Sequence, residues 1–466
     1  MSVGQHALED GELAENRHPI LFCCTHSTGE ANTSIALAGE LARRGVPDLW
    51  FASDENHRAA VEALADRSEV QFVSMGEVNP RLALTMLDDK TYGRIMQPSR
   101  TKALRARVRQ LFDMEHHFAR YRALAELVEK IQPSLMVINR FCFHAIQVAL
   151  TFDVPYLITA PCLPSSLLEY DLPRDYPLPS SGLPRRMTRR QKLANWHFRL
   201  SQSTIPLSPT VLREAVKYSK SLTELGIDSR TCKTRTQNAS AELLLCFSAP
   251  GLDYAFPVPD NLRLLGALIP PVRTDPRDGA ALAWLDEQPS VVYVAFGSVT
   301  RLTAAHIHSM LDVVRRLGDR RHQVLWVLSE EQQQLLPDPA ELPANLRVEA
   351  WIWSQHSVLA HPNVRAFFTH GGSNSFHEGV YFGKPLLVRP VCIDQYDHAV
   401  RALDTGLGLS VERPAALDAD DVYDKLLRLL TEESFGERAR HFAEVQRAAG
   451  GLTAAADLVL DHVTRD

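Results

Sequence analysis

The stretch Val364–Pro390, VRAFFTHGGSNSFHEGVYFGKPLLVRP, decides the fold because it joins a buried strand to a helix through a glycine turn. Its first apolar run ends at His370, and the Gly371-Gly372 pair lets the backbone approach a ligand closely. Ser373 then opens a helical pattern. Free N–H groups at a helix start, assisted by the helix dipole, bind anions, so the turn predicts a diphosphate site.

Polar side chains extend this predicted site into the helix. Asn374 and Ser375 add neutral hydrogen-bond donors, and Glu378 lies three residues beyond Ser375 on the same helical face. A carboxylate there can accept hydrogen bonds from the hydroxyls of a ribose. An ordinary strand–turn–helix with a capping serine explains the glycine pair equally well, so the surrounding sequence has to decide between the two.

Alternating strands and helices surround this stretch and predict two parallel, doubly wound α/β domains. The first set of apolar runs is 19–24, 47–53, 70–75, 135–141 and 155–160, and the second is 291–298, 324–329, 346–353, 364–370 and 385–390. A chain of 466 residues with 45% hydrophobic residues has enough apolar surface for two cores. The longest helix-like segment, 101–133, is expected to pack one face on the first sheet.

Proline content marks the boundary between the predicted domains. We expect an N-terminal domain over 1–255, a proline-rich linker over 256–280 and a C-terminal domain over 281–440. The last segment, 441–466, has a helical pattern and is expected to cross back to the first domain.

Charge and composition exclude several classes of function. The net charge of -6 is spread over mixed stretches and gives no basic face for nucleic acid. No spacing of cysteine, histidine and carboxylates matches a metal site, and no apolar run is long enough to span a membrane. The seven scattered cysteines are typical of reduced thiols, so we expect a cytoplasmic protein. One basic stretch, from Pro184 to Leu200, predicts a solvated helix rather than a membrane-surface helix.

The stretch Val364–Pro390 resembles the signature of the UDP-glycosyltransferases, the nucleotide-sugar-dependent enzymes with a GT-B fold. The likeness continues upstream through WLDEQPSVVYVAFGS and QHSVLAHPNV, and downstream through VCIDQYDHA and DTGLGL. It is strong over about Trp284 to Leu409 and follows only the general pattern in the N-terminal half. The order and length of these blocks favour the ligand site over an ordinary turn.

The resemblance implies a role for each matching residue. The diphosphate would lie against the turn residues and Ser298, the ribose would bind Glu378 and Gln355, and the transferred sugar would bind Asp394 and Gln395. The implied nucleotide-sugar site comprises Ser298, Trp353, Gln355, His370, Gly372, Ser373, Asn374, Ser375, Glu378, Asp394, Gln395 and His398. A carboxylate beside an amide suits two adjacent sugar hydroxyls, because one group accepts while the other donates and accepts.

Two positions depart from the family pattern. Ile352 stands where the family usually has a tryptophan that stacks on uracil, although its neighbours Trp351 and Trp353 can supply a ring if the loop shifts. His398 stands where an asparagine is common, which makes the identity of the sugar less certain than that of the nucleotide.

The turn after the first strand, CCTHSTGEANTSIALAGELARRG, is where family members carry the catalytic base, usually a histidine oriented by an aspartate. Here the alignment implies Glu30 at the base position and Asn139 at the position of the aspartate, with His26 nearby. A carboxylate base needs no second carboxylate to fix its tautomer, and an asparagine can donate to it. Near a helix start, with an ordinary pKa of about 4.3, Glu30 is expected to be ionised and a weak base. His26, or no enzymatic base at all, stays an alternative.

The resemblance therefore implies an inverting transferase that moves a sugar, with UDP-glucose as the expected donor, to a hydroxyl of an apolar small molecule. It implies no metal and no tightly bound cofactor, and we expect a monomer or weak dimer. The missing histidine–aspartate pair leaves open a catalytically inactive nucleotide-sugar-binding protein. An epimerase on the same fold is a weaker alternative.

Overall fold

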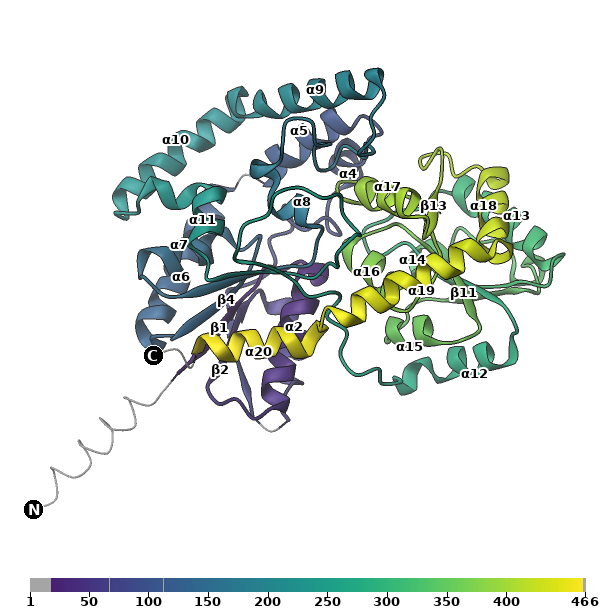
Figure 1. The fold of residues 1–466 in the computed structure, drawn as a ribbon, viewed down its shortest axis with the longest axis horizontal. Helices are drawn as coiled ribbons and strands as arrows, with labels where there is room; N and C mark the ends of the chain where they lie inside the picture. The colour runs from purple at the N-terminus through teal and green to yellow at the C-terminus, as the bar shows by residue number, and fades with distance from the viewer. Residues whose placement is uncertain (1–17, 67, 112, 464–466) are drawn as a thin grey trace, which may run out of the picture.

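Two parallel β-sheets, each covered by helices, lie side by side in the computed structural model (Figure 1), which describes residues 18–66, 68–111 and 113–463. The first sheet has the order β3-β2-β1-β4-β5-β6-β7 and the second the order β10-β9-β8-β11-β12-β13. All neighbouring strands are parallel. Sequence alternation therefore predicted the fold class correctly.

The N-terminal half combines seven strands with helices on both faces of their sheet. The strands are β1 (Ile20–Cys23), β2 (Leu49–Ser53), β3 (Val70–Ser74), β4 (Leu135–Asn139), β5 (Tyr156–Ala160), β6 (Leu243–Cys246) and β7 (Leu262–Leu264). The helices are α2 (Thr28–Arg43), α3 (Arg58–Glu62), α4 (Asp89–Ile95), α5 (Arg100–Leu111), α6 (Met114–Ile131), α7 (Phe143–Thr151), α8 (Pro164–Leu167), α9 (Arg189–Ser203), α10 (Pro209–Glu224) and α11 (Thr234–Ser240).

The C-terminal half repeats this plan with a smaller sheet. Its strands are β8 (Val291–Ala295), β9 (Gln323–Val327), β10 (Leu346–Glu349), β11 (Val364–Thr369), β12 (Leu386–Val388) and β13 (Gly408–Ser410). Its helices are α12 (Gly279–Glu287), α13 (Ala304–Gly318), α14 (Glu330–Gln333), α15 (Gln355–Ala360), α16 (Ser373–Tyr381), α17 (Gln395–Thr405), α18 (Ala419–Thr431), α19 (Glu433–Ala448) and α20 (Gly451–Val463).

The central strands are apolar throughout because both faces of each sheet are buried. In β1, Leu21 packs with α6 and α7 on one face, and Ile20 and Phe22 pack with α2 on the other. The last helix, α20, adds its buried residues to this second cluster and so lies against the N-terminal half, as Figure 1 shows in yellow. Arg44, the C-cap residue of α2, also forms an ion pair with Asp457 of α20.

Two segments differ from the sequence-based expectation. The segment expected as one long helix is two helices, α5 and α6, because the Asp113 side chain accepts a hydrogen bond from the His116 N–H and starts a new helix. The proline-rich stretch expected as linker contains β7, which pairs with β6 in the first sheet. A proline-rich stretch can still carry a short edge strand, because an edge strand needs partners on one side only.

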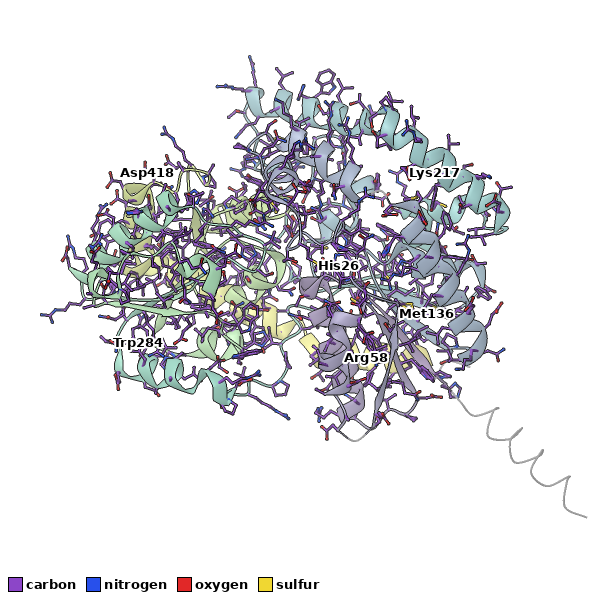
Figure 2. The ribbon with its side chains drawn as sticks, turned by 180° about the vertical axis from the view of Figure 1, so that it is seen from behind. His26, Arg58, Met136, Lys217, Trp284 and Asp418 are labelled. Atoms are coloured by element: carbon purple, nitrogen blue, oxygen red, sulfur yellow. The ribbon has the colours of Figure 1, made fainter. Side chains whose placement is uncertain are left out.

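Buried polar contacts hold the two halves together. The Asp397 carboxylate of α17 accepts hydrogen bonds from the backbone N–H groups of Ser180 and Gly182, at 2.6 and 2.9 Å. Arg401 of the same helix pairs with buried Asp253 at 3.0 Å. These contacts fix the position of one half relative to the other. His26 is labelled in Figure 2 near the place where the two halves meet.

Candidate active site

A large cleft separates the carboxyl ends of the two sheets, where ligands of open α/β sheets bind. Its volume of about 2370 Å³ exceeds the roughly 300–1,000 Å³ of an ordinary small-molecule pocket. The cleft is therefore large enough for two substrates. Both Glu30 of the N-terminal half and the predicted diphosphate turn line it.

His370 follows β11 and fills a space that two glycines leave open. A Cβ atom at Gly372 would lie 2.4 Å from its Nε2 atom, and one at Gly297 would lie 2.7 Å from its Cε1 atom. Burial lowers the pKa of His370 to about 4, so the ring is neutral at pH 7 and offers a diphosphate a hydrogen bond without a full charge.

The start of α16 is built to receive an anion. Gly372 is its N-cap residue, and no side chain caps the free N–H groups of the first turn. The Ser373 hydroxyl is buried without a hydrogen-bond partner among the described residues. Ser298 and Ser375 also line the cleft. An incoming diphosphate would satisfy these donors, which gives them a reason to be left unpaired.

Glu378, one turn further along α16, is held in place by α15. Gln355 Nε2 donates to its carboxylate at 2.6 Å, and His356 Nε2 lies 3.4 Å from the other oxygen. Burial raises the pKa of Glu378, but the contacts with His356 and Gln355 outweigh it, so the pKa lies below its usual value. An ionised carboxylate beside an amide is suited to the two hydroxyls of a ribose. His356 had not been singled out from the sequence, although it adjoins Gln355.

The loop before α15 presents two exposed tryptophans and buries the residue between them. Ile352 packs in the core of the C-terminal half, whereas Trp351 and Trp353 each leave more than half of the side chain exposed and line the cleft. The Arg277 guanidinium lies 3.5 Å from the centre of the Trp353 ring and covers one of its faces. The predicted stacking of Trp353 on uracil can therefore use only the face opposite Arg277.

The two residues expected at the transferred sugar differ in whether other parts of the protein already use their hydrogen-bonding groups. Asp394 lies in the cleft, where burial raises its pKa above the usual value and Arg107 opposes part of that rise. Gln395 uses its amide oxygen to accept hydrogen bonds from the backbone N–H groups of Val391 and Cys392, at 2.8 and 3.0 Å. Only its amide N–H groups stay available, so Gln395 can donate to a sugar hydroxyl but not accept from one.

His398 does not face the cleft, which corrects its assignment to the nucleotide-sugar site. The ring is completely buried, stacks on Phe376 with centroids 4.7 Å apart, and bonds through Nδ1 to the Gly371 carbonyl at 2.8 Å. Its pKa is lowered to about 4 by burial. His398 therefore supports the glycine turn from behind and makes no direct contact with a ligand in the cleft.

Glu30 and Asn139 meet at the carboxyl end of the first sheet, where α2 begins and β4 ends. Asn139 Nδ2 donates to Glu30 Oε2 at 2.9 Å, while its Oδ1 atom accepts from the Phe141 N–H at 3.0 Å, which fixes the orientation of the amide. Burial raises the pKa of Glu30 to about 7, although the Asn139 hydrogen bond and the Arg140 charge oppose the rise. The sequence predicts a carboxylate that is fully ionised at neutral pH, whereas burial brings the pKa of Glu30 into the neutral range.

His26 lies on a different side of the same turn. Its ring is within electrostatic range of Asp54 and Arg120, which form a buried ion pair, and burial lowers its pKa below the usual value. The structure shows no hydrogen bond between His26 and Glu30. The two candidate bases are therefore separate groups, and only Glu30 is paired with Asn139.

One contact joins the two halves of the site directly. Asn374 Nδ2, in the first turn of α16, donates to the backbone carbonyl of Gly29 at 2.7 Å. Gly29 immediately precedes Glu30, so the predicted diphosphate turn and the predicted base are neighbours. This hydrogen bond also means that the Asn374 amide is engaged with the protein, although its sequence-based role was to bind the diphosphate.

Comparisons with known proteins agree with this geometry. A family model described as UDP-glucoronosyl and UDP-glucosyl transferase matches residues 102–448. The chain belongs to this family. The UDP-glycosyltransferase signature inferred from Val364–Pro390 is thereby confirmed.

Individual relatives are distant. The 2-hydroxyacylsphingosine 1-beta-galactosyltransferase of Rattus norvegicus is 27% identical over 46% of this chain and 38% of its own length. The UDP-glucuronosyltransferase 2A3 of Homo sapiens is 24% identical over 58% of this chain and 48% of its own length. The chain therefore matches less than half of the length of these relatives.

Solved structures cover almost the whole chain. The glycosyltransferase of kitacinnamycin has a TM-score of 0.66 at 19% identity, covering 96% of this chain and 99% of its own. The UDP-glucose: anthocyanidin 3-O-glucosyltransferase, solved with UDP, has a TM-score of 0.64 at 18% identity, covering 97% of this chain and 100% of its own. These likenesses establish the predicted GT-B fold.

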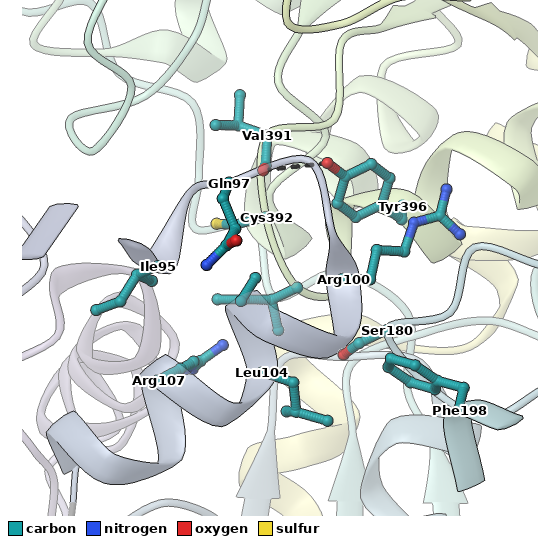
Figure 3. A pocket seen from close by; sticks show the side chains of 12 residues that line it. Ile95, Gln97, Arg100, Leu104, Arg107, Ser180, Phe198, Val391, Cys392 and Tyr396 are labelled. Carbon is teal, nitrogen blue, oxygen red and sulfur yellow. Dashed lines mark hydrogen bonds between the residues drawn. The ribbon is translucent and has the colours of Figure 1, made fainter. Parts of the chain in front are cut away.

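The cleft also contains a charged residue, Arg107 of α5, that the sequence did not single out. Its guanidinium is within electrostatic range of both Glu30 and Asp394 and forms no hydrogen bond within the described part of the chain. Figure 3 shows Arg107 with Cys392 and Tyr396 around a side cavity of about 30 Å³, which holds about one or two waters. In the sequence, nothing distinguishes Arg107 from the neighbouring arginines of α5. Only the packing of α5 against the C-terminal half brings the Arg107 guanidinium near Glu30 and Asp394.

The described residues, 18–66, 68–111 and 113–463, contain neither a cluster of metal ligands nor a membrane-spanning helix. No group of three or more His, Cys, Asp or Glu side chains that could hold a metal ion occurs there. No helix there is long and apolar enough to cross a bilayer.

Proposed function

We propose that this protein is an inverting glycosyltransferase that moves glucose from UDP-glucose to a hydroxyl of an apolar small molecule. The observation that carries the proposal is the Glu30–Asn139 pair, 2.9 Å apart, in a turn that Asn374 ties to the donor loop at 2.7 Å. A general base and a diphosphate site on opposite walls of one cleft suit a direct displacement at the anomeric carbon.

Residues on the two walls of the cleft carry out different parts of the proposed transfer reaction. Glu30 takes the proton of the acceptor hydroxyl as its oxygen attacks the anomeric carbon, and the bond from that carbon to UDP breaks on the opposite face. A base with a pKa of about 7 is well matched to neutral pH. The start of α16, the Ser373 hydroxyl and neutral His370 donate to the charge that develops on the leaving diphosphate. In this proposal no metal is needed.

The choice of sugar and acceptor is supported by the residues beside the base and by the structural neighbours. Asp394 as acceptor and the Gln395 amide as donor suit two adjacent sugar hydroxyls, which favours glucose. Structural neighbours include the glycosyltransferases of kitacinnamycin and calicheamicin and an anthocyanidin 3-O-glucosyltransferase, which supports a small-molecule acceptor in the N-terminal half. Seven free cysteines favour the reducing cytoplasm, and we propose that the protein acts there as a monomer or weak dimer.

Acceptor-dependent UDP release, measured over a panel of phenols and sterols, tests the proposal. We expect Glu30→Gln to bind UDP-glucose within a few-fold of the parent protein but to turn over at least about 10²-fold more slowly, the range for loss of a general base. His26→Ala is the matched control in the same turn and should lose less. A larger loss in His26→Ala would move the base to His26, and tight UDP-glucose binding without release for any acceptor would indicate an inactive binding protein.

A further inference from the structure

Helix α9 exposes a continuous apolar face on the outside of the N-terminal half. Leu193, Trp196 and Leu200 are 65%, 61% and 46% exposed, and their spacing of three and four residues places them on one side of the helix. The opposite side is buried through Phe198. Figure 1 shows α9 and α10 together along the outer edge of the molecule, away from the sheet. Exposed aromatic and leucine side chains in such a row are typical of an interaction surface.

Further exposed apolar side chains follow α9 along the chain. Leu207 in the connection and Leu212 and Val216 of α10 are also exposed. We refer to residues 186–220 as the α9–α10 ridge. Leu212 also lines the active-site cleft, together with Ile205. The ridge is therefore continuous with one wall of the cleft.

Unpaired positive charge accompanies these apolar residues. Arg186, Arg189, Arg190 and Lys192 are exposed, and none of them forms an ion pair within the described residues. Helix α9 contains no aspartate or glutamate. Since the whole chain has a net charge of -6, this positive patch is a local feature and not a consequence of overall composition.

We propose that the α9–α10 ridge binds an anionic lipid membrane surface. A helix with leucine and tryptophan on one face and arginine and lysine beside it lies in the plane of a bilayer, with the apolar side chains in the acyl boundary and the cations at the headgroups. The charge favours an anionic surface over a neutral one. The sequence favoured a solvated helix, because its apolar residues follow helical spacing only loosely. In the fold, however, the side chains of Leu193, Trp196 and Leu200 are exposed on one side of α9.

Co-sedimentation of the full chain with lipid vesicles tests this surface. We expect binding to vesicles of phosphatidylcholine mixed with phosphatidylserine, weakened by salt, and little binding to phosphatidylcholine alone. Each cation near an anionic surface contributes about fivefold in affinity, so changing Arg186, Arg189, Arg190 and Lys192 to glutamine should weaken binding by on the order of 10²-fold or more. Trp196→Ser should also weaken binding while leaving the four charges in place.

A control variant removes four positive charges from another part of the surface. Arg122, Lys130, Arg315 and Arg320 are exposed on or beside α6 and α13, and their joint change to glutamine should leave vesicle binding within about twofold, because they lie off the ridge. Equal loss in this control, equal binding to both vesicle types, or no binding to either would overturn the proposal. Self-association that Trp196→Ser abolishes, without vesicle binding, would instead make the ridge a contact between copies. Since the assay uses no sugar nucleotide, its outcome is independent of the proposed transfer reaction.

Discussion

Removing the Asn139 amide should shift the pH dependence of the reaction. The amide donates to Glu30 at 2.9 Å and holds its pKa down, in opposition to burial. A hydrogen bond to a charged group contributes about 1.5–3 kcal/mol, which corresponds to about one to two pKa units. In Asn139→Ala the pKa of Glu30 should therefore rise from about 7 to roughly 8–9.

The sign of the effect follows from the role of Glu30 as a base. Only the ionised carboxylate accepts a proton, so kcat/KM should increase with pH up to the pKa and then level off. At pH 7 the ionised fraction, and hence kcat/KM, should fall by roughly 5- to 50-fold in Asn139→Ala and should largely recover at higher pH. The measurement is a pH profile of kcat/KM for UDP release with one acceptor at fixed ionic strength.

Asn139→Asp separates the charge effect from damage to the turn. An aspartate keeps an oxygen that can accept from the Phe141 N–H, but it places a second carboxylate against Glu30, which should raise the apparent pKa at least as far. UDP binding by calorimetry should stay unchanged in both variants, because Asn139 lies on the other wall of the cleft. An acidic limb that stays near pH 7 in both variants would refute the assignment of Glu30 as the titrating base.

The remaining predictions concern the donor site. Glu378→Ala should weaken UDP and UDP-glucose alike by about 1.5–3 kcal/mol, whereas Asp394→Ala should weaken UDP-glucose only, because Asp394 is assigned to the sugar. Titration calorimetry with both ligands checks this, and an equal loss of UDP affinity in the two variants would contradict the roles. Initial rates should be nearly the same in excess EDTA and in millimolar magnesium, since we propose that neutral donors of α16 and His370 bind the diphosphate. Loss of activity on chelation, restored by a divalent metal, would mean that a carboxylate such as Asp394 is a ligand.

Local sequence determined the donor half of the site. The strand end at His370, the glycine pair and the helix that carries Ser373 and Glu378 are consecutive, so their relative positions follow from the geometry of one strand–turn–helix unit. Alternation of apolar runs with helical segments likewise predicted both parallel sheets. In each case the informative pattern, the side-chain period within one strand or helix, lies within a single segment of the chain.

Tertiary structure decided the charge states and the surroundings of the other residues. Glu30 and Asn139 are 109 residues apart in the chain, and their contact and burial, which bring the pKa of Glu30 to about 7, exist only once the sheet has formed. Packing likewise buries His398 and leaves the apolar face of α9 exposed. It also brings Arg107, one of several arginines in α5, close to Glu30 and Asp394. Desolvation and electrostatic interaction depend on every segment within several ångströms, and sequence spacing does not record which segments those are.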